Sequence, residues 1–169
     1  MAKYILSTLV ENRSGVLTRI SGLFARRGYN IDSLSVCTTE DTAYSRMTIV
    51  VNGDERVLSQ IKKQLEKLPD VYKVITLEDR ESVLRELLLV KIRVTAAQRA
   101  EIVQTAAIYK AKTIDLSPET MILELTGEGA KIDGFLGVIA PYGILEMART
   151  GLTALHRGAA CIKDGSEEV

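Results

Sequence analysis

The chain has 169 residues, of which 46% are hydrophobic and 26% charged, a composition typical of a globular protein with one ordinary core or two small ones. Its 22 basic and 22 acidic residues cancel, so it lacks the net positive charge that drives nucleic-acid binding. No apolar run approaches the length of a membrane span, and Ser7 and Thr8 interrupt the region where a signal peptide is apolar. We therefore expect a cytoplasmic protein with no nucleic-acid partner and no membrane partner.

The first half of the chain predicts the element order βαββαβ. The expected elements are strand 3–10, helix 15–27, strand 30–38, strand 44–52, helix 55–67 and strand 71–78. The first helix is expected to begin after an N-cap at Ser14, to bury an apolar face and to stop at Gly28. That face consists of Val16, Ile20, Leu23 and Phe24. Asp54 and Pro69 bracket the second helix.

A charged linker at 78–83 leads into a second half that repeats this order. Alternating apolar residues predict a strand over 88–94, and Thr95 to Gln98 forms a capping-box pattern that opens a helix ending near 109. The remaining elements are expected to be strands at 111–116 and 120–126, a helix ending at Pro141 and a strand at 143–149. The buried face of that helix is expected to contain Ile132, Phe135, Leu136 and Ile139. The fold class predicted is α+β, with two ferredoxin-like βαββαβ domains in tandem.

In a ferredoxin-like domain two helices cover one face of a four-stranded sheet and leave the other face open. The strand over 44–52 has apolar residues on both faces, because Met47, Ile49 and Val51 alternate with Thr48 and Val50. We therefore expect dimerisation through the sheets.

The chain offers no convincing catalytic constellation. The single histidine, His156, is distant from both cysteines in sequence and is expected at the surface or at a helix end. Cys37 and Cys161 are isolated and are expected to be packing residues. Gly127-Glu-Gly129 lacks the remaining glycines of a dinucleotide fingerprint, so it is interpreted as a turn. The central strands carry no stacking aromatics apart from Tyr44 at a strand end, which argues against an RNA-recognition module.

Two further segments have the chemistry of a small-ligand site. The turn from Asn12 to Gly15 leaves the first N–H groups of a helix facing outward, where they would suit an anion. Asn30 and Ile31 begin the next strand, at the opposite end of that helix. The two segments therefore do not meet within one subunit but can meet across a dimer. A zwitterion would fit such a seam, with its carboxylate near Gly15 and Val16.

At these residues the chain resembles a known family, the regulatory or small subunits of acetolactate synthase, also called acetohydroxyacid synthase. The similarity covers nearly the whole sequence. It is carried by L-V-E-N-R-S-G-V-L-T-R-I-S-G-L-F-A-R-R-G-Y-N-I-D-S-L at the start, S-R-M-T-I at 45–49, R-E-L-L-L-V-K-I at 85–92 and A-R-T-G-L-T-A-L-H-R-G near the end. The resemblance implies an ACT domain over 1–79, for effector binding and dimerisation, and a C-terminal ferredoxin-like domain over 80–169.

The resemblance also implies a function and partners. The chain is expected to form a homodimer that activates a separate catalytic subunit and confers feedback inhibition by valine or a related branched-chain amino acid. Thiamine diphosphate, magnesium and FAD are expected on the catalytic subunit, and neither a cofactor nor a metal on this chain. By position in the family motif, the effector contacts are expected to be Asn12, Gly15, Val16, Leu17, Asn30 and Ile31.

Two alternatives from other classes remain. A small hydrolase of the acylphosphatase kind uses an arginine in the first turn of this scaffold, and Arg13 occupies that place, although the glycine-rich signature of that class is missing. An amino-acid-responsive transcription regulator would need a basic helix-turn-helix, and both halves of the chain are already used by βαββαβ units. The residues alone do not distinguish valine, leucine and isoleucine.

Overall fold

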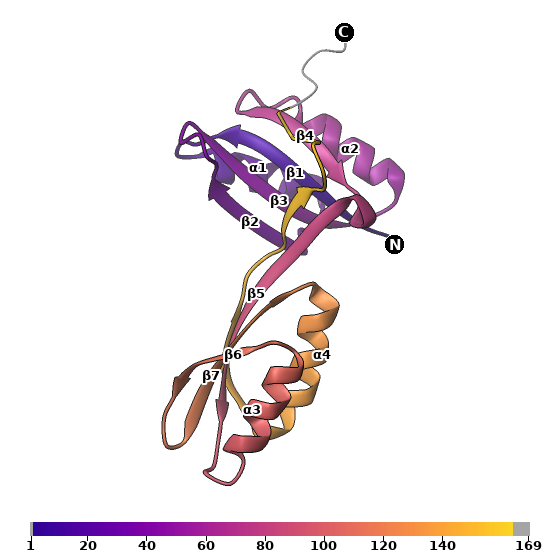
Figure 1. Ribbon diagram of the computed structural model, residues 1–169. Coiled ribbons are helices and arrows are strands. Elements are labelled where there is room, and N and C mark those ends of the chain that lie inside the picture. Colours follow the sequence, from indigo (N-terminus) through magenta and orange to yellow (C-terminus); the bar gives the residue numbers. More distant parts are fainter. Residues whose placement is uncertain (1, 164–169) are drawn as a thin grey trace. The chain divides into compact units, whose positions relative to one another are not determined.

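The computed structural model describes residues 2–163 and divides them into two compact units, each built from a sheet and two helices (Figure 1). The second unit is Arg85–Thr150, and the first unit comprises the chain before it together with the segment that follows it from Gly151. The expected α+β class with two ferredoxin-like units is confirmed. The contacts group 151–163 with the first unit, whereas the sequence predicted a single division near residue 80.

The first unit is an antiparallel sheet with two helices on one face. Its elements are β1 (Ala2–Glu11), α1 (Val16–Arg27), β2 (Ser33–Thr38), β3 (Tyr44–Gly53), α2 (Glu55–Leu65) and β4 (Val71–Leu77), followed by the 3-10 turn η1 (Asp79–Glu81). The strand order is β2-β3-β1-β4, so the two sequence-adjacent strands β2 and β3 pair and β1 lies in the centre. This order leaves β2 and β4 as the edges of the sheet.

The helices cover the sheet face that carries Leu6, Val10 and Ile49, which are all buried. All four residues predicted for the buried face of α1 are in this core. Gly28 ends the helix with a left-handed φ of 69°, and the Tyr29 N–H then donates to the Phe24 carbonyl at 3.0 Å, as expected of a glycine C-cap.

The two helix starts in this unit have different outcomes. Asp54 caps α2 as predicted, because its carboxylate accepts from the Val57 N–H at 2.8 Å. Ser14 does not cap α1. Gly15 occupies the cap position with a left-handed φ of 87°, and no side chain bonds to the first N–H groups of the helix. A backbone turn that needs φ > 0 favours glycine, and its geometry takes Ser14 out of the capping position.

The opposite face of the first sheet is covered by the chain's own C-terminal segment, which corrects the expectation of an open face. Buried Leu152 and Ala154 pack on Ile5, Val50 and Leu77. The segment contains a short strand, β9 (Thr153–His156), which the sequence did not predict, and this strand pairs with β5. An apolar face made by Ile5, Val50 and Leu77 must be buried, and the same chain supplies the cover.

The second unit repeats the topology with strand order β6-β7-β5-β8. Its elements are β5 (Ser82–Arg93), α3 (Arg99–Ile108), β6 (Lys112–Leu116), β7 (Thr120–Gly127), α4 (Gly129–Ile139), the 3-10 turn η2 (Ala140–Tyr142) and β8 (Ile144–Arg149). Helix α4 contains Gly134 and Gly137 after its first turn, each costing about 1 kcal/mol relative to alanine in a helix interior. It is held by buried Ile132, Phe135 and Ile139, as the periodicity predicted.

The capping box before α3 forms only in part. The Gln98 side-chain oxygen accepts from the Thr95 N–H at 3.2 Å and from its hydroxyl at 2.8 Å, but the helix begins at Arg99 and has no side-chain cap.

Three smaller expectations concern single residues and the membrane. Cys37 and Cys161 are both exposed, so the prediction that they are packing residues is wrong. His156 is half-buried in strand β9 rather than at a helix end. Within 2–163, no helix has the length and apolar character to cross a membrane.

The α2 cap gives a direct test of the first unit. Asp54→Ala should lower the free energy of unfolding by about 1 kcal/mol, because it leaves the Val57 N–H without its side-chain acceptor. Asp54→Asn keeps an acceptor of the same size and should retain most of that free energy. Urea denaturation followed by circular dichroism measures both variants. Equal losses in the two would show that the carboxylate charge, and not the hydrogen bond, stabilises the helix start.

Candidate functional site

The β1–α1 turn, residues 12–15, is the first segment of the predicted site. Residues Asn12 to Gly15 are exposed, while the side chain of Val16 is 4% exposed and packs into the core. Only the backbone of Val16 is therefore available to a ligand. An added Cβ on Gly15 would meet no heavy atom within 4 Å, so the space beside the helix start is open. The first turn of α1 also contains no acidic residue that would compete for its N–H groups.

A buried carboxylate holds this turn. Asp70, in the loop between α2 and β4, has a side chain that is 1% exposed, and it accepts from the guanidinium groups of Arg13 and Arg19. The hydrogen bond from Arg13 lowers the pKa of Asp70 below its ordinary value, against the opposing effect of burial, and the positive charge of Arg19 adds to the lowering. The backbone is tied as well, because the Glu11 N–H donates to the Asp70 carbonyl at 2.9 Å.

Both arginines near the turn are engaged with carboxylates. Arg13 pairs with both Glu11, at 2.6 Å, and Asp70, so its guanidinium is engaged in holding the turn. Nothing in this arrangement favours the hydrolase alternative, in which Arg13 would bind a phosphoryl group. Arg19 is 47% exposed on α1, and its guanidinium reaches the same carboxylate.

Asn12 braces the turn from the other side. Its side-chain amide donates to the Thr42 carbonyl at 2.8 Å, and its side-chain oxygen accepts from the Ser45 hydroxyl at 3.0 Å. The Asn12 N–H donates to the Ala43 carbonyl at 2.8 Å. The turn is therefore fixed to the β2–β3 hairpin, and the Asn12 side chain acts as a brace in the isolated subunit.

Asn30 and Ile31 lie at the other end of α1. Asn30 is exposed and donates to the Asp32 carboxylate at 2.7 Å, while Ile31 is half-buried against the first core. The Asn12 side chain is hydrogen-bonded to Ser45 of β3. At the other end of α1, the Asp32 N–H donates to the Val50 carbonyl of the same strand at 2.9 Å. Five residues of strand separate these points by roughly 17 Å. One subunit does not bring the two segments together, as the sequence predicted.

The remaining member of the predicted set, Leu17, is 47% exposed at the start of α1. Val36, on edge strand β2, is 43% exposed. An uncapped helix start with an exposed leucine beside it offers N–H donors for a carboxylate and an apolar contact for an aliphatic side chain.

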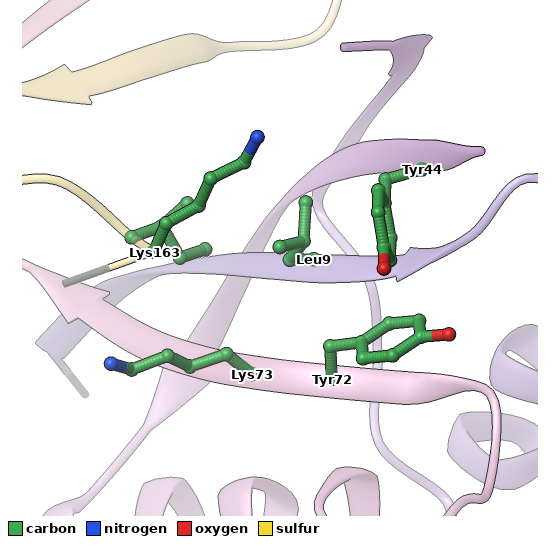
Figure 2. Close-up of a pocket in the computed structure, with 6 residues that line it drawn as sticks. Leu9, Tyr44, Tyr72, Lys73 and Lys163 are labelled. Carbon is green, nitrogen blue, oxygen red and sulfur yellow. The ribbon is translucent and has the colours of Figure 1, made fainter. Parts of the chain in front are cut away.

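A separate pocket of about 290 Å³ lies on the face of the first sheet that the C-terminal segment covers. Figure 2 shows Tyr44 and Tyr72 beside Leu9 at this pocket, and their rings pack edge to face with centroids 4.7 Å apart. Two of its polar groups are engaged, because the Tyr72 hydroxyl donates to Glu11 at 3.3 Å and Lys163 pairs with Glu40 at 2.6 Å. None of the predicted effector residues lines it.

The part of the chain that the structure describes contains no group of three or more histidine, cysteine, aspartate or glutamate side chains that could hold a metal ion.

Comparison with known proteins adds the decisive observation. The family described as "AHAS small subunit-like ACT domain" matches residues 6–73, and "Small subunit of acetolactate synthase" matches residues 85–158. The chain is 47% identical over 157 residues to the probable acetolactate synthase small subunit of Methanothermobacter thermautotrophicus, covering 92% of this chain and 94% of that protein. It is 44% identical over 155 residues to the acetolactate synthase small subunit of Mycobacterium bovis, covering 92% of each.

The chain belongs to the acetolactate synthase small-subunit family. It is a regulatory part of an acetolactate synthase holoenzyme, with an N-terminal ACT domain. A crystal structure of the acetolactate synthase small subunit from Thermotoga maritima matches with a TM-score of 0.89 and 37% identity, covering 95% of this chain and all of that one. The second family match extends to residue 158, beyond the point where the chain returns to the first structural unit at Gly151.

Sequence reasoning missed Asp70. It noted the neighbouring Pro69 as the end of a helix but gave the aspartate no role. The available signal was an aspartate between Pro69 and the apolar strand 71–78, in a chain with arginines at 13 and 19. Nothing local to residue 70 identifies which cations it meets.

The contacts of Asp70 with Arg13 and Arg19 predict that the fold is sensitive to acid. Because the folded pKa of Asp70 is depressed, its stabilising effect is complete above the unfolded pKa and is lost as pH falls through the lower, folded value. Asp70→Asn should therefore lower the free energy of unfolding at pH 7. The difference in this free energy between the variant and the unmodified chain should become smaller as pH falls below about 4. Urea midpoints across this pH range measure it.

Asp115→Asn is the matched control, because this carboxylate lies on β6, whose residues are all exposed. Its effect at pH 7 should stay within about 0.5 kcal/mol. If the loss of unfolding free energy caused by Asp70→Asn stays constant with pH, the ionised Asp70 is not the group that holds the turn.

Proposed function

We propose that two copies of this chain pair through their ACT domains, bind a branched-chain amino acid at the seam and thereby regulate a separate acetolactate synthase catalytic subunit. Family membership supports the partnership with a large catalytic subunit. The observation that carries the effector site is the open, uncapped helix start at Gly15, with Asn30 and Ile31 at the far end of the same helix. The proposal thus explains why one chain holds two half-sites.

The edge strand β2 supplies a way to join the half-sites. It lies at the end of the sheet order, and its residues from Val36 to Thr38 are exposed. Two β2 strands related by a two-fold axis would run antiparallel and continue the sheet. Such pairing sets the start of one β2, next to Asn30, beside the end of the other, next to the Asn12 turn of the partner copy. A two-fold axis would create two identical effector sites.

The amino acid would then be bound by complementary groups. Its carboxylate would accept from the N–H groups at Gly15 and Val16, where the positive end of the helix dipole favours an anion. Asn30 donates its amide to Asp32, which leaves its side-chain oxygen as an acceptor for the ammonium group. Leu17 and Ile31 would contact the aliphatic side chain. Valine is the expected effector, with leucine and isoleucine as alternatives of the same chemistry.

In this proposal the chemistry belongs to the catalytic subunit. Thiamine diphosphate, magnesium and FAD would be bound there, and the small subunit would change the activity through contact alone. Cytoplasmic location, where this biosynthetic chemistry would take place, remains a prediction.

Reconstitution tests the division of labour. The purified chain, given pyruvate and all three cofactors, should form no acetolactate, and its addition to the catalytic subunit should raise the rate. A colorimetric acetolactate assay with increasing small subunit measures this, and the increase should saturate at a fixed stoichiometry. Turnover by the chain alone would contradict the proposal.

Gly15 allows the effector site to be tested separately from the backbone. Gly15→Asp would put a carboxylate where the effector's carboxylate is expected, whereas Gly15→Asn adds a side chain of the same size without the charge. Both residues tolerate the left-handed φ of 87° better than other side chains do, so the pair shares the backbone strain. The aspartate variant should lose valine inhibition in the reconstituted enzyme and keep activation, and the asparagine variant should retain more of the inhibition.

Valine titrations of both holoenzymes give the answer. Unchanged inhibition with Gly15→Asp would move the site elsewhere, and loss of assembly in both variants would mean that Gly15 serves only the backbone turn. Asn30→Ala should weaken valine binding in the same direction, because it removes the proposed ammonium acceptor.

A further inference from the structure

Gly151, the first residue of the segment that returns to the first unit, is packed against the backbone of edge strand β2. A Cβ built on Gly151 would lie 2.5 Å from the Leu34 carbonyl oxygen and 2.7 Å from both the Leu34 carbonyl carbon and the Ser35 hydroxyl oxygen. Non-bonded heavy atoms do not approach one another so closely. A backbone carbonyl of a strand cannot move away as the end of a flexible side chain can. The φ of Gly151 lies outside the left-handed region, so its backbone conformation is open to other residues. A glycine is needed at this position because there is no room for a side chain.

The next residue fastens the same contact. The Leu152 N–H donates to the Ser33 hydroxyl at 2.9 Å. The Leu152 side chain is 3% exposed and packs on Ile5, Val50 and Leu77 in the first unit. Gly151 and Leu152 are therefore held against residues 33–35 of β2 by close backbone packing, by one hydrogen bond and by the burial of the Leu152 side chain.

The residue before them is fastened in the second unit. The Thr150 N–H donates to the Leu87 carbonyl at 3.0 Å, and the Thr150 hydroxyl accepts from the Leu87 N–H at 2.9 Å. One peptide bond thus joins a residue held on β5 of the second unit to a residue held on β2 of the first unit. A shift of residues 33–35 of β2 therefore acts directly on the peptide that follows Thr150.

We propose that Gly151 and Leu152 form a latch through which edge strand β2 transmits occupancy of the effector site to the second unit. The latch rests on the proposed function, because β2 starts two residues after Ile31 and its exposed edge is the proposed seam. Ordering of that seam by an amino acid changes the position or the rigidity of β2, and the latch carries the change to the second unit. Gly151 and Ser33 are positioning residues, and neither contacts the effector.

The test separates effector binding from its consequence. Gly151→Ala and Ser33→Ala are compared with Gly137→Ala, the same substitution on α4, where an added Cβ meets nothing within 4 Å. Calorimetry measures binding of L-valine to each small subunit, and the acetolactate assay measures inhibition of each reconstituted holoenzyme. L-leucine and L-isoleucine are run in parallel on the unmodified chain.

We expect Gly151→Ala to bind valine with unchanged affinity while the concentration for half-inhibition rises about tenfold, a typical size for an allosteric coupling. Ser33→Ala, which removes only the hydrogen bond, should show a smaller shift in the same direction. Gly137→Ala should match the unmodified chain in both measurements. This pattern, with binding kept and inhibition weakened, is one that a loss of folding cannot produce.

Unchanged inhibition in both latch variants would overturn the latch. If Gly151→Ala does not fold or does not bind valine, Ser33→Ala decides: weakened inhibition with unchanged binding supports the latch, and any other result overturns it. A failure of the proposed function has a different signature, because the unmodified holoenzyme would then respond to none of the three amino acids.

Discussion

The buried carboxylate of Asp70 fixes the part of the first unit on which the candidate site depends. It accepts from Arg13 in the β1–α1 turn and from Arg19 in α1, and Arg13 is 57 positions away in sequence. A buried charge left without a partner is costly, so the contacts of Asp70 with Arg13 and Arg19 resist separation. The helix start at Gly15 lies between the two arginines in sequence and is therefore presented by a rigid frame, although the turn itself is exposed.

The two units share a topology but treat the free face of the sheet differently. In the second unit that face is mixed: Lys91 lies opposite Glu146 and Lys112 opposite Glu124, with charged atoms 3.9 and 4.0 Å apart, and half-buried Leu89 and Ile122 lie among them. The charged side chains on this face can remain hydrated. In the first unit the same face carries Ile5, Val50 and Leu77, and the C-terminal segment buries them. The C-terminal segment thus covers the face that is formed by three buried apolar residues.

Local patterns predicted local structure well. Within residues 2–163, apolar periodicity located all four α-helices and eight of the nine strands, and Asp54 and Gly28 marked helix ends by chemistry that is readable within a few residues. The failures came from distant contacts. Ser14 looked like a cap until the left-handed turn at Gly15 displaced it, and the partners of Asp70 and the placement of β9 depend on residues far away in sequence. The six predicted effector residues divide in the same way: their local geometry is visible in one chain, whereas their convergence needs a second copy.

Because the chain leaves the first unit at Leu84 and returns at Gly151, the second unit is an insertion within the first. Domains usually fold from the N-terminus as they emerge from the ribosome. Here the sheet that is synthesised first keeps Ile5, Val50 and Leu77 exposed until Leu152 and Ala154 have been made, after the whole second unit. The N-terminal domain is therefore the last to be completed during synthesis, and its apolar face must be kept from aggregating while the inserted unit folds.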